Sequence, residues 1–155
     1  MSLFLDTTYR SSETELMDDF SMKGDLLRDT LDKLGNINKW LGGNRITLNG
    51  IEQLLKQQPK NNDIVLTTLF LHHFKEEDIK TLLSNLSKKA NLGIVVNDLQ
   101  RSEIAYGLFK ILGLVISNHM IKEDGLTSIL RAFKREDLVH ISKALNLKSQ
   151  IHWKW

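Results

Sequence analysis

Residues 63–74, with the sequence DIVLTTLFLHHF, decide the fold that this chain predicts. From Ile64 to Leu71 every residue is aliphatic, aromatic or threonine, so an extended chain here would show no polar stripe to water. Such a segment is typical of a central strand in a parallel sheet, where helices cover both faces. We therefore expect residues 64–71 to form a strand that is buried on both faces.

The residues that follow predict the connection that a parallel strand needs. From Lys75 to Lys89, apolar residues recur at helical spacing, and a second strand is predicted from Leu92 to Val96. A strand, helix, strand unit indicates an open α/β sheet, whose ligands bind beyond the carboxyl ends of the strands. Those ends carry Phe70, His72 and His73 after the first strand, and Asn97 and Asp98 after the second.

Helical patterns fill most of the remaining chain. Asp25 precedes an apolar repeat that ends at Gly42 and Gly43, and a second helix is expected from Thr47 to Pro59. We also expect a helix over 102–117, a polar loop over 118–126, a helix over 134–145 and an extended end over 150–155. The acidic residues of a short helix that could start at Ser11 are expected to face mainly solvent; they are Glu13, Glu15, Asp18 and Asp19.

The composition of the chain argues against some classes of function. The chain has 155 residues, 41% of them hydrophobic, a net charge of +2 and no cysteine. The balanced charge argues against a nucleic-acid partner, including a helix-turn-helix domain built on residues 134–147. The absence of cysteine suits a reducing cytosol, and no apolar run approaches the length of a membrane span. We therefore expect a cytoplasmic protein without a membrane span.

Two adjacent histidines follow the first predicted strand. On a continuing strand, His72 and His73 would point to opposite sides and would not hold one metal ion together. The other three histidines add no HxxxH or HExxH spacing, so we predict no metal centre. One histidine of the pair is a candidate for orienting substrate or accepting a proton. A hydrogen bond from it to a loop carbonyl is the alternative.

Several strings spread over the chain carry a family resemblance when they are taken in order. They are Arg10 with residues 15–18 (ELMD), residues 37–43 (INKWLGG), residues 63–74, residues 96–99 (VNDL) with Arg101, Asp124 with Gly125, and residues 131–133 (RAF). This ordered set resembles the class I S-adenosylmethionine-dependent methyltransferases, in particular bacterial small-molecule enzymes like those of quinone biosynthesis.

The resemblance implies a fold and a division of the chain. It implies an α/β protein with a Rossmann-like methyltransferase sheet, incomplete in this sequence, and an N-terminal helical cap. Residues 1–58 would form the cap, and residues 59–155 would form the second half of the methyltransferase domain. The implied cofactor is S-adenosylmethionine, and the implied substrate is a small, partly apolar methyl acceptor.

The resemblance also assigns roles to individual residues. Leu69 and Phe70 would line the cofactor pocket and His73 would close it. The catalytic candidates are His73 and Asp98, and the substrate-binding candidates are Arg10, Asn97, Arg101 and Arg131. The residue types alone allow other roles, which are core packing for the two apolar residues and a structural ion pair for Asp98 with Arg101.

One part of the family pattern is absent from the sequence. The family has a Gly-rich turn and a ribose-binding acid before the strand at residue 64, whereas only five residues separate Gln57 from Asp63. Either the chain is a deleted family member or the sequence joins two pieces of a longer protein. We expect the chain as given to bind S-adenosylmethionine poorly or not at all. The alternative function is a non-catalytic interaction module that forms a homodimer, or docks a partner, through an exposed strand edge or the cap helices.

Overall fold

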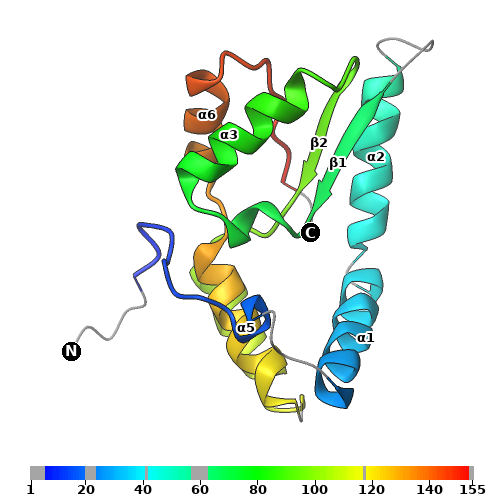
Figure 1. Ribbon diagram of the computed structural model, residues 1–155. Helices are drawn as coiled ribbons and strands as arrows, with labels where there is room; N and C mark the ends of the chain where they lie inside the picture. Colours follow the sequence, from blue (N-terminus) through cyan, green and yellow to red (C-terminus); the bar gives the residue numbers. More distant parts are fainter. Residues whose placement is uncertain (1–5, 20–23, 41, 57–62, 117, 154–155) are drawn as a thin grey trace. The chain divides into compact units, whose positions relative to one another are not determined.

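The computed structural model describes residues 6–19, 24–40, 42–56, 63–116 and 118–153 (Figure 1). Within these ranges the chain is an α/β protein with six α-helices and one two-stranded parallel sheet. It divides into two compact units. The first unit comprises residues 1–37 and 99–134, and the second comprises residues 38–98 and 135–155.

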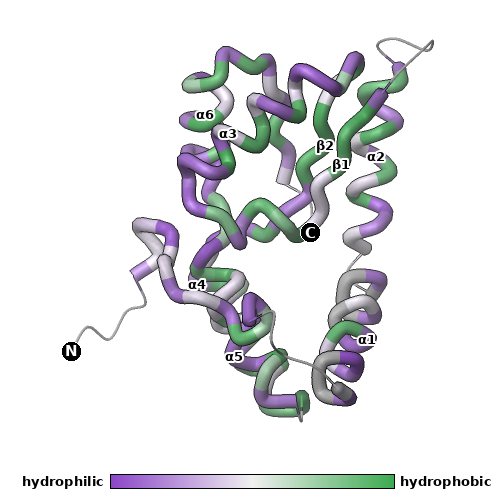
Figure 2. The backbone as a smooth tube through the Cα atoms, viewed as in Figure 1, coloured by the Kyte–Doolittle hydropathy of each residue, from purple (hydrophilic) through white to green (hydrophobic). Residues whose placement is uncertain are grey.

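The sheet lies in the second unit and has the predicted strand, helix, strand order. Strand β1 (Ile64–Thr68) is followed by helix α3 (Glu76–Ser87) and strand β2 (Gly93–Asn97). The two strands pair in parallel, with Ile64 opposite Gly93 and Thr68 opposite Asn97. In Figure 2 both strands are hydrophobic along most of their length. The crossover that the sequence predicted is therefore confirmed.

Helices lie on both sides of this sheet. Helix α2 (Gly43–Leu55) packs so closely that a Cβ atom added at Gly50 would lie 2.8 Å from a methyl carbon of Val95. Helix α3 lies on the other side of the sheet (Figure 1) and buries Ile79 and Leu83. Helix α6 (Arg135–Ala144) packs against α3. The second unit therefore has the layered arrangement that a parallel sheet requires.

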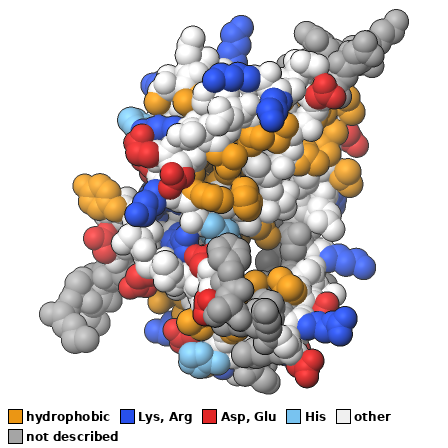
Figure 3. Space-filling view, in the orientation of Figure 1, with side chains coloured by type: hydrophobic (Ala, Val, Ile, Leu, Met, Phe, Trp, Pro, Cys, Tyr) orange, Lys and Arg blue, Asp and Glu red, His pale blue; other side chains and the backbone are white. Residues whose placement is uncertain are grey.

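The prediction of a strand buried on both faces is wrong, because only Thr67 of the five residues of β1 is buried. Leu66 in β1 is 48% exposed and Val96 in β2 is 37% exposed. Within the described residues β1 has a neighbouring strand on one edge only, so its side chains lack cover on the other edge. Figure 3 shows hydrophobic side chains reaching the surface on the face that it views. Hydrophobicity identified the strand, but it could not show how many neighbours the strand has.

The first unit is helical. It contains most of helix α1 (Asp25–Trp40), a short 3₁₀ helix η1 (Leu16–Asp18), helix α4 (Glu103–Leu112) and helix α5 (His119–Arg131). Helices α4 and α5 pack against each other, and η1 packs against α5. In this unit the side chains of Met120, Ile121, Ile129 and Phe133 are buried.

Three sequence expectations for the second half of the chain are wrong. The predicted loop over 118–126 is mostly the start of α5, because the Asn118 side chain caps that helix by accepting a hydrogen bond from the Ile121 N–H at 3.3 Å. Helix α4 ends at Leu112, and Gly113 begins a turn. Residues 150–153 form no strand.

The same asparagine connects α5 to α1. Asn118 Nδ2 donates to Asp29 Oδ2 at 2.9 Å and to Thr30 Oγ1 at 3.0 Å. Hydrogen bonds from Lys33 and then from Asn118 lower the pKa of Asp29. The resulting stabilisation is therefore present above the ordinary carboxyl pKa, and it is lost as the pH falls through the lowered value.

No helix in the described ranges combines the length and the hydrophobicity that a bilayer crossing requires.

The contact between α4 and α5 gives a test of the fold. A Cβ atom added at Gly125 would lie 2.2 Å from the Phe109 ring, whereas at Gly35 in α1 it would meet no atom within 4 Å. Overpacking costs about 1–3 kcal/mol, and replacing a helical glycine by alanine gains about 0.5–1 kcal/mol. We expect Gly125→Ala to lower the free energy of unfolding by about 1 kcal/mol and Gly35→Ala to raise it. Urea denaturation measures both. Equal stabilisation by the two variants would contradict this packing.

Candidate functional site at the carboxyl end of the sheet

The chain leaves β1 through an unusual backbone conformation. Leu69 has a φ of +49°, in the left-handed region that residues with a Cβ rarely adopt. Its N–H donates to the Asn97 carbonyl at 2.8 Å, so Leu69 still pairs with the end of β2. This turn ends β1 at Thr68 instead of the predicted Leu71, and it leads into a 3₁₀ turn, η2 (Leu71–His73).

Asp98 holds this turn to the end of β2. Its Oδ2 atom accepts hydrogen bonds from the Leu71 N–H at 2.8 Å and the Phe70 N–H at 3.3 Å. Its Oδ1 atom lies 2.5 Å from Nδ1 of His72, and both of these side chains are only 3% exposed. One carboxylate therefore satisfies three polar groups at the carboxyl edge of the sheet.

The carboxylate also orients the imidazole. A carboxylate accepts hydrogen bonds, so the hydrogen of this pair is assigned to Nδ1 of His72. Enzymes use the same arrangement to fix the tautomer and the ring orientation of a general base. Asp98 is thus a positioning group for His72. This contact could not be read from the sequence, because it joins residues 26 positions apart.

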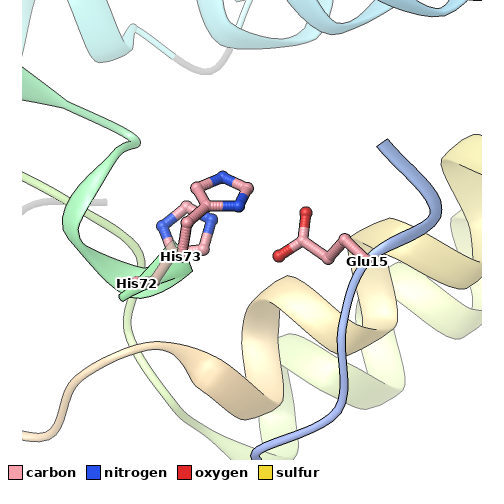
Figure 4. Close-up of side chains that lie close together, drawn as sticks. All are labelled: Glu15, His72 and His73. Atoms are coloured by element: carbon pink, nitrogen blue, oxygen red, sulfur yellow. The ribbon is translucent and has the colours of Figure 1, made fainter. Parts of the chain in front are cut away.

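The two histidines do not lie as the sequence predicted. They belong to η2 and not to an extended strand, so they do not point to opposite sides. Their ring centroids are 4.2 Å apart with an interplanar angle of 35° (Figure 4). Phe70, just before them, is 44% exposed and makes an edge-to-face contact with Phe74. Imidazole and phenyl groups are therefore adjacent at this edge.

Asn97 connects the same edge to helix α2. Its Nδ2 atom donates to the Gly43 carbonyl and to Thr47 Oγ1, each at 3.0 Å. The Thr47 hydroxyl lies 3.5 Å from that of Thr68 at the end of β1. The start of α2 therefore belongs to the site. No local pattern indicates this contact, because Gly43 and Thr47 have the spacing of residues at helix boundaries only.

Arg101 lies in the first unit, where its guanidinium binds backbone carbonyls. Nε donates to Thr7 O at 2.9 Å, while the two terminal nitrogens donate to Ala132 O at 2.5 Å and Thr8 O at 3.3 Å. The residue is 2% exposed. Its described contacts hold the N-terminal segment to the end of α5. The substrate-binding role assigned to Arg101 stays a prediction.

Arg10 and Arg131 also lie in the first unit. Arg10 Nε donates to the Arg131 carbonyl at 2.6 Å, and its guanidinium lies 4.4 Å from the Phe133 ring centroid. Arg131 pairs with Asp18 at 2.6 Å and lies 3.8 Å from a carboxylate oxygen of Glu15. Glu15 and Asp18 were expected to face mainly solvent. This expectation is wrong for both acids, because they lie beside Arg131.

The predicted site residues belong to both units. One group surrounds the carboxyl edge of the sheet and consists of Leu69, Phe70, His73, Asn97 and Asp98. The three arginines form the other group in the first unit. The sequence assigns no role to Asp124, which was quoted only for the resemblance. It is a buried residue whose carboxylate accepts the Leu16 and Met17 N–H groups at 2.6 and 2.9 Å.

An open hollow of about 590 Å³ lies in the first unit, and it contains none of the predicted site residues. Its lining is Ser12, Glu13, Thr14, Leu16, His119, Glu123, Asp124 and Thr127.

Comparison with known proteins identifies no relative. The chain matches no protein-family model, no curated protein and no solved structure. The chemistry at the carboxyl edge of the sheet is therefore the basis for inferring a function.

The hydrogen bonds of Asp98 predict that truncation of its side chain lowers the free energy of unfolding substantially. Asp98→Ala would leave the Leu71 N–H and the buried His72 ring without this acceptor, and we expect a loss of about 2–4 kcal/mol in the free energy of unfolding. Asp98→Asn keeps one oxygen acceptor and should cost less. The control Glu52→Ala changes an exposed residue of α2 and should stay within about 0.5 kcal/mol. Urea unfolding curves that coincide for Asp98→Ala and the control would contradict the network.

Proposed function

We propose that this chain is a methyltransferase of the S-adenosylmethionine-dependent class, or a truncated relative of one, and that it acts on a small, partly apolar acceptor. The observation that supports this proposal is the Asp98 carboxylate, which joins the ends of two parallel strands and orients His72 there. Ligands of open α/β sheets bind at this edge.

The side chains at the edge suit such an acceptor. Leu69 and Phe70 offer apolar surface, and Phe70 is partly exposed. His73 is the candidate for moving a proton, because imidazole is the side chain that enzymes most often use as a general acid or base. Asp98, which was predicted to be catalytic, would act through His72 by fixing its position. Asn97 would keep the start of α2 close to the acceptor.

The described residues do not fit the cofactor as a complete site. A Gly-rich turn after a strand lets the backbone approach a nucleotide-like ligand. Two described glycines with a positive φ adjoin the sheet. Gly42 is next to its carboxyl edge but follows helix α1 and not a strand, and Gly93 begins β2 at the end opposite Asp98. The carboxyl edge would therefore supply only the part of the cofactor pocket that Leu69, Phe70 and His73 line, next to the acceptor.

This proposal predicts weak, local cofactor binding. In an NMR titration of the ¹⁵N,¹³C-labelled chain with S-adenosylmethionine up to about 5 mM, we expect shifts confined to residues 69–73 and 97–98, with a millimolar dissociation constant. Phe70→Ala should remove these shifts, and the Glu52→Ala control should keep them. The absence of any local shift would contradict the methyltransferase assignment. Micromolar binding would instead show that the chain holds the cofactor without the Gly-rich turn.

The open edge of β1 favours a second candidate function, a non-catalytic module that docks a partner strand. The Asp63 carbonyl accepts a hydrogen bond from the Leu92 N–H at 3.1 Å, and the Leu69 N–H donates to the Asn97 carbonyl at 2.8 Å. Both groups therefore face β2. Alternate residues of a strand direct their backbone groups to the same edge, so the N–H of Thr67 also faces β2 and that of Leu66 faces away. Within the described residues no strand pairs with that outer edge.

Amide hydrogen exchange tests whether this edge is open. We expect the Leu66 N–H to exchange at least tenfold faster than the Thr67 N–H, because only the latter faces β2. Two-dimensional NMR after transfer to deuterated water measures both rates in one sample. Equal protection of the two amides would mean that the outer edge is covered, which would contradict a strand-docking module.

A further inference from the structure

The η2 turn of the second unit brings two imidazole rings together. They belong to His72 and His73, and their centroids are 4.2 Å apart (Figure 4). A ring nitrogen of one residue lies within 4.8 Å of a ring nitrogen of the other. An extended strand would have directed the two rings to opposite sides. The turn therefore removes the reason for which these histidines were expected not to hold one metal ion together.

The distance between the two nitrogens is near the one that a shared ion requires. Zinc binds histidine nitrogen at about 2.0–2.1 Å, so two nitrogens on one tetrahedral zinc ion lie about 3.3 Å apart. His72 is buried, whereas His73 is half-buried. A rotation of the less buried His73 side chain would therefore bring the pair to the ligating distance.

Asp98 prepares His72 for this role. Its Oδ1 atom lies 2.5 Å from Nδ1 of His72, so the hydrogen of a neutral ring is on Nδ1 and the metal-binding lone pair is on Nε2. Histidines that ligate metal ions usually donate their other ring N–H to a carboxylate or carbonyl in this way. Because His72 is only 3% exposed, packing also holds its ring in place.

The donor atoms indicate the class of ion. Imidazole nitrogen suits transition metals such as zinc, whereas Mg²⁺ and Ca²⁺ prefer oxygen ligands. We propose that His72 and His73 bind a divalent transition-metal ion such as Zn²⁺, and that Asp98 is the positioning residue for His72. Two nitrogen ligands leave two positions of a tetrahedral ion for water or for an oxygen atom of a small molecule.

This metal site does not depend on the proposed methyltransferase function. Phe70 precedes the histidines and is 44% exposed, so a small molecule that coordinates the ion would have apolar surface beside it. In the metal-bound chain His73 is a ligand, and the proton-moving role proposed for it belongs to the metal-free chain.

The first test measures zinc binding by calorimetry on the untagged chain. With zinc chloride we expect a dissociation constant of about 1–100 μM. His73→Ala should weaken this binding at least tenfold. The matched control is His140→Ala, which removes an exposed histidine of α6 that lies 3.4 Å from a Glu76 carboxylate oxygen. It should leave the dissociation constant unchanged.

Three results of this titration would overturn the proposal. They are the absence of binding at about 1 mM zinc, equal affinities of His73→Ala and the original chain, and loss of binding in His140→Ala. Far-UV circular dichroism checks that both variants remain folded.

The second test identifies the ligating atoms and the role of Asp98. In long-range ¹H–¹⁵N NMR spectra, zinc should shift Nε2 of His72 and one ring nitrogen of His73. Asp98→Asn should populate the Nε2–H tautomer of His72, because an amide can also donate to Nδ1, and it should weaken zinc binding about tenfold. The exposed Asp78→Asn in α3 is the matched control and should change neither property. An Asp98→Asn chain with the original tautomer and zinc affinity would contradict the positioning role.

The third test concerns the choice of ion. The zinc affinity should be unchanged in about a tenfold excess of magnesium chloride over zinc, because imidazole is a poor ligand for Mg²⁺. Displacement of zinc by this excess of Mg²⁺ would assign the binding to carboxylates and would refute the histidine site.

Discussion

The second unit depends on one buried carboxylate. Asp98 accepts hydrogen bonds from two backbone N–H groups of the turn after β1 and contacts the His72 ring. Without this acceptor, the N–H of the buried Leu71 would lose its hydrogen-bond partner at the end of an apolar strand, which is costly. The turn that Asp98 holds ends β1 early, brings the histidines together and positions Phe70. The fold and the candidate site thus share a single set of hydrogen bonds.

The sequence predicted the parts of the fold that depend on local pattern. The uniform apolar run of β1 and the helical repeat of α3 were sufficient to predict the parallel crossover. The start of α5 was missed because its polar first turn resembles a loop, although Asn118 is a recognisable cap. The exposure of Leu66 was missed because composition cannot count the neighbours of a strand.

The candidate site was predicted less completely than the fold. Adjacency in sequence grouped Asn97 with Asp98 and His72 with His73, and the rule that ligands bind at strand ends put the two pairs at one edge. Which atom of Asp98 binds which donor depends on the left-handed conformation of Leu69, and no local pattern indicates it. The arginines were assigned by resemblance, and their contacts with carbonyls and acids in the first unit required the structure.

The hydrogen bonds of Arg101 also constrain the order in which the parts of the first unit fold. Arg101 bonds to Thr7 and Thr8, which are more than 90 positions earlier, and to Ala132, which is 31 positions later. During synthesis the N-terminal segment emerges long before its carbonyls can meet this guanidinium. Contacts between such distant residues form slowly, because a long loop must close first. The N-terminal segment is therefore among the last parts of the first unit to be fixed, and until then it is open to proteases and chaperones.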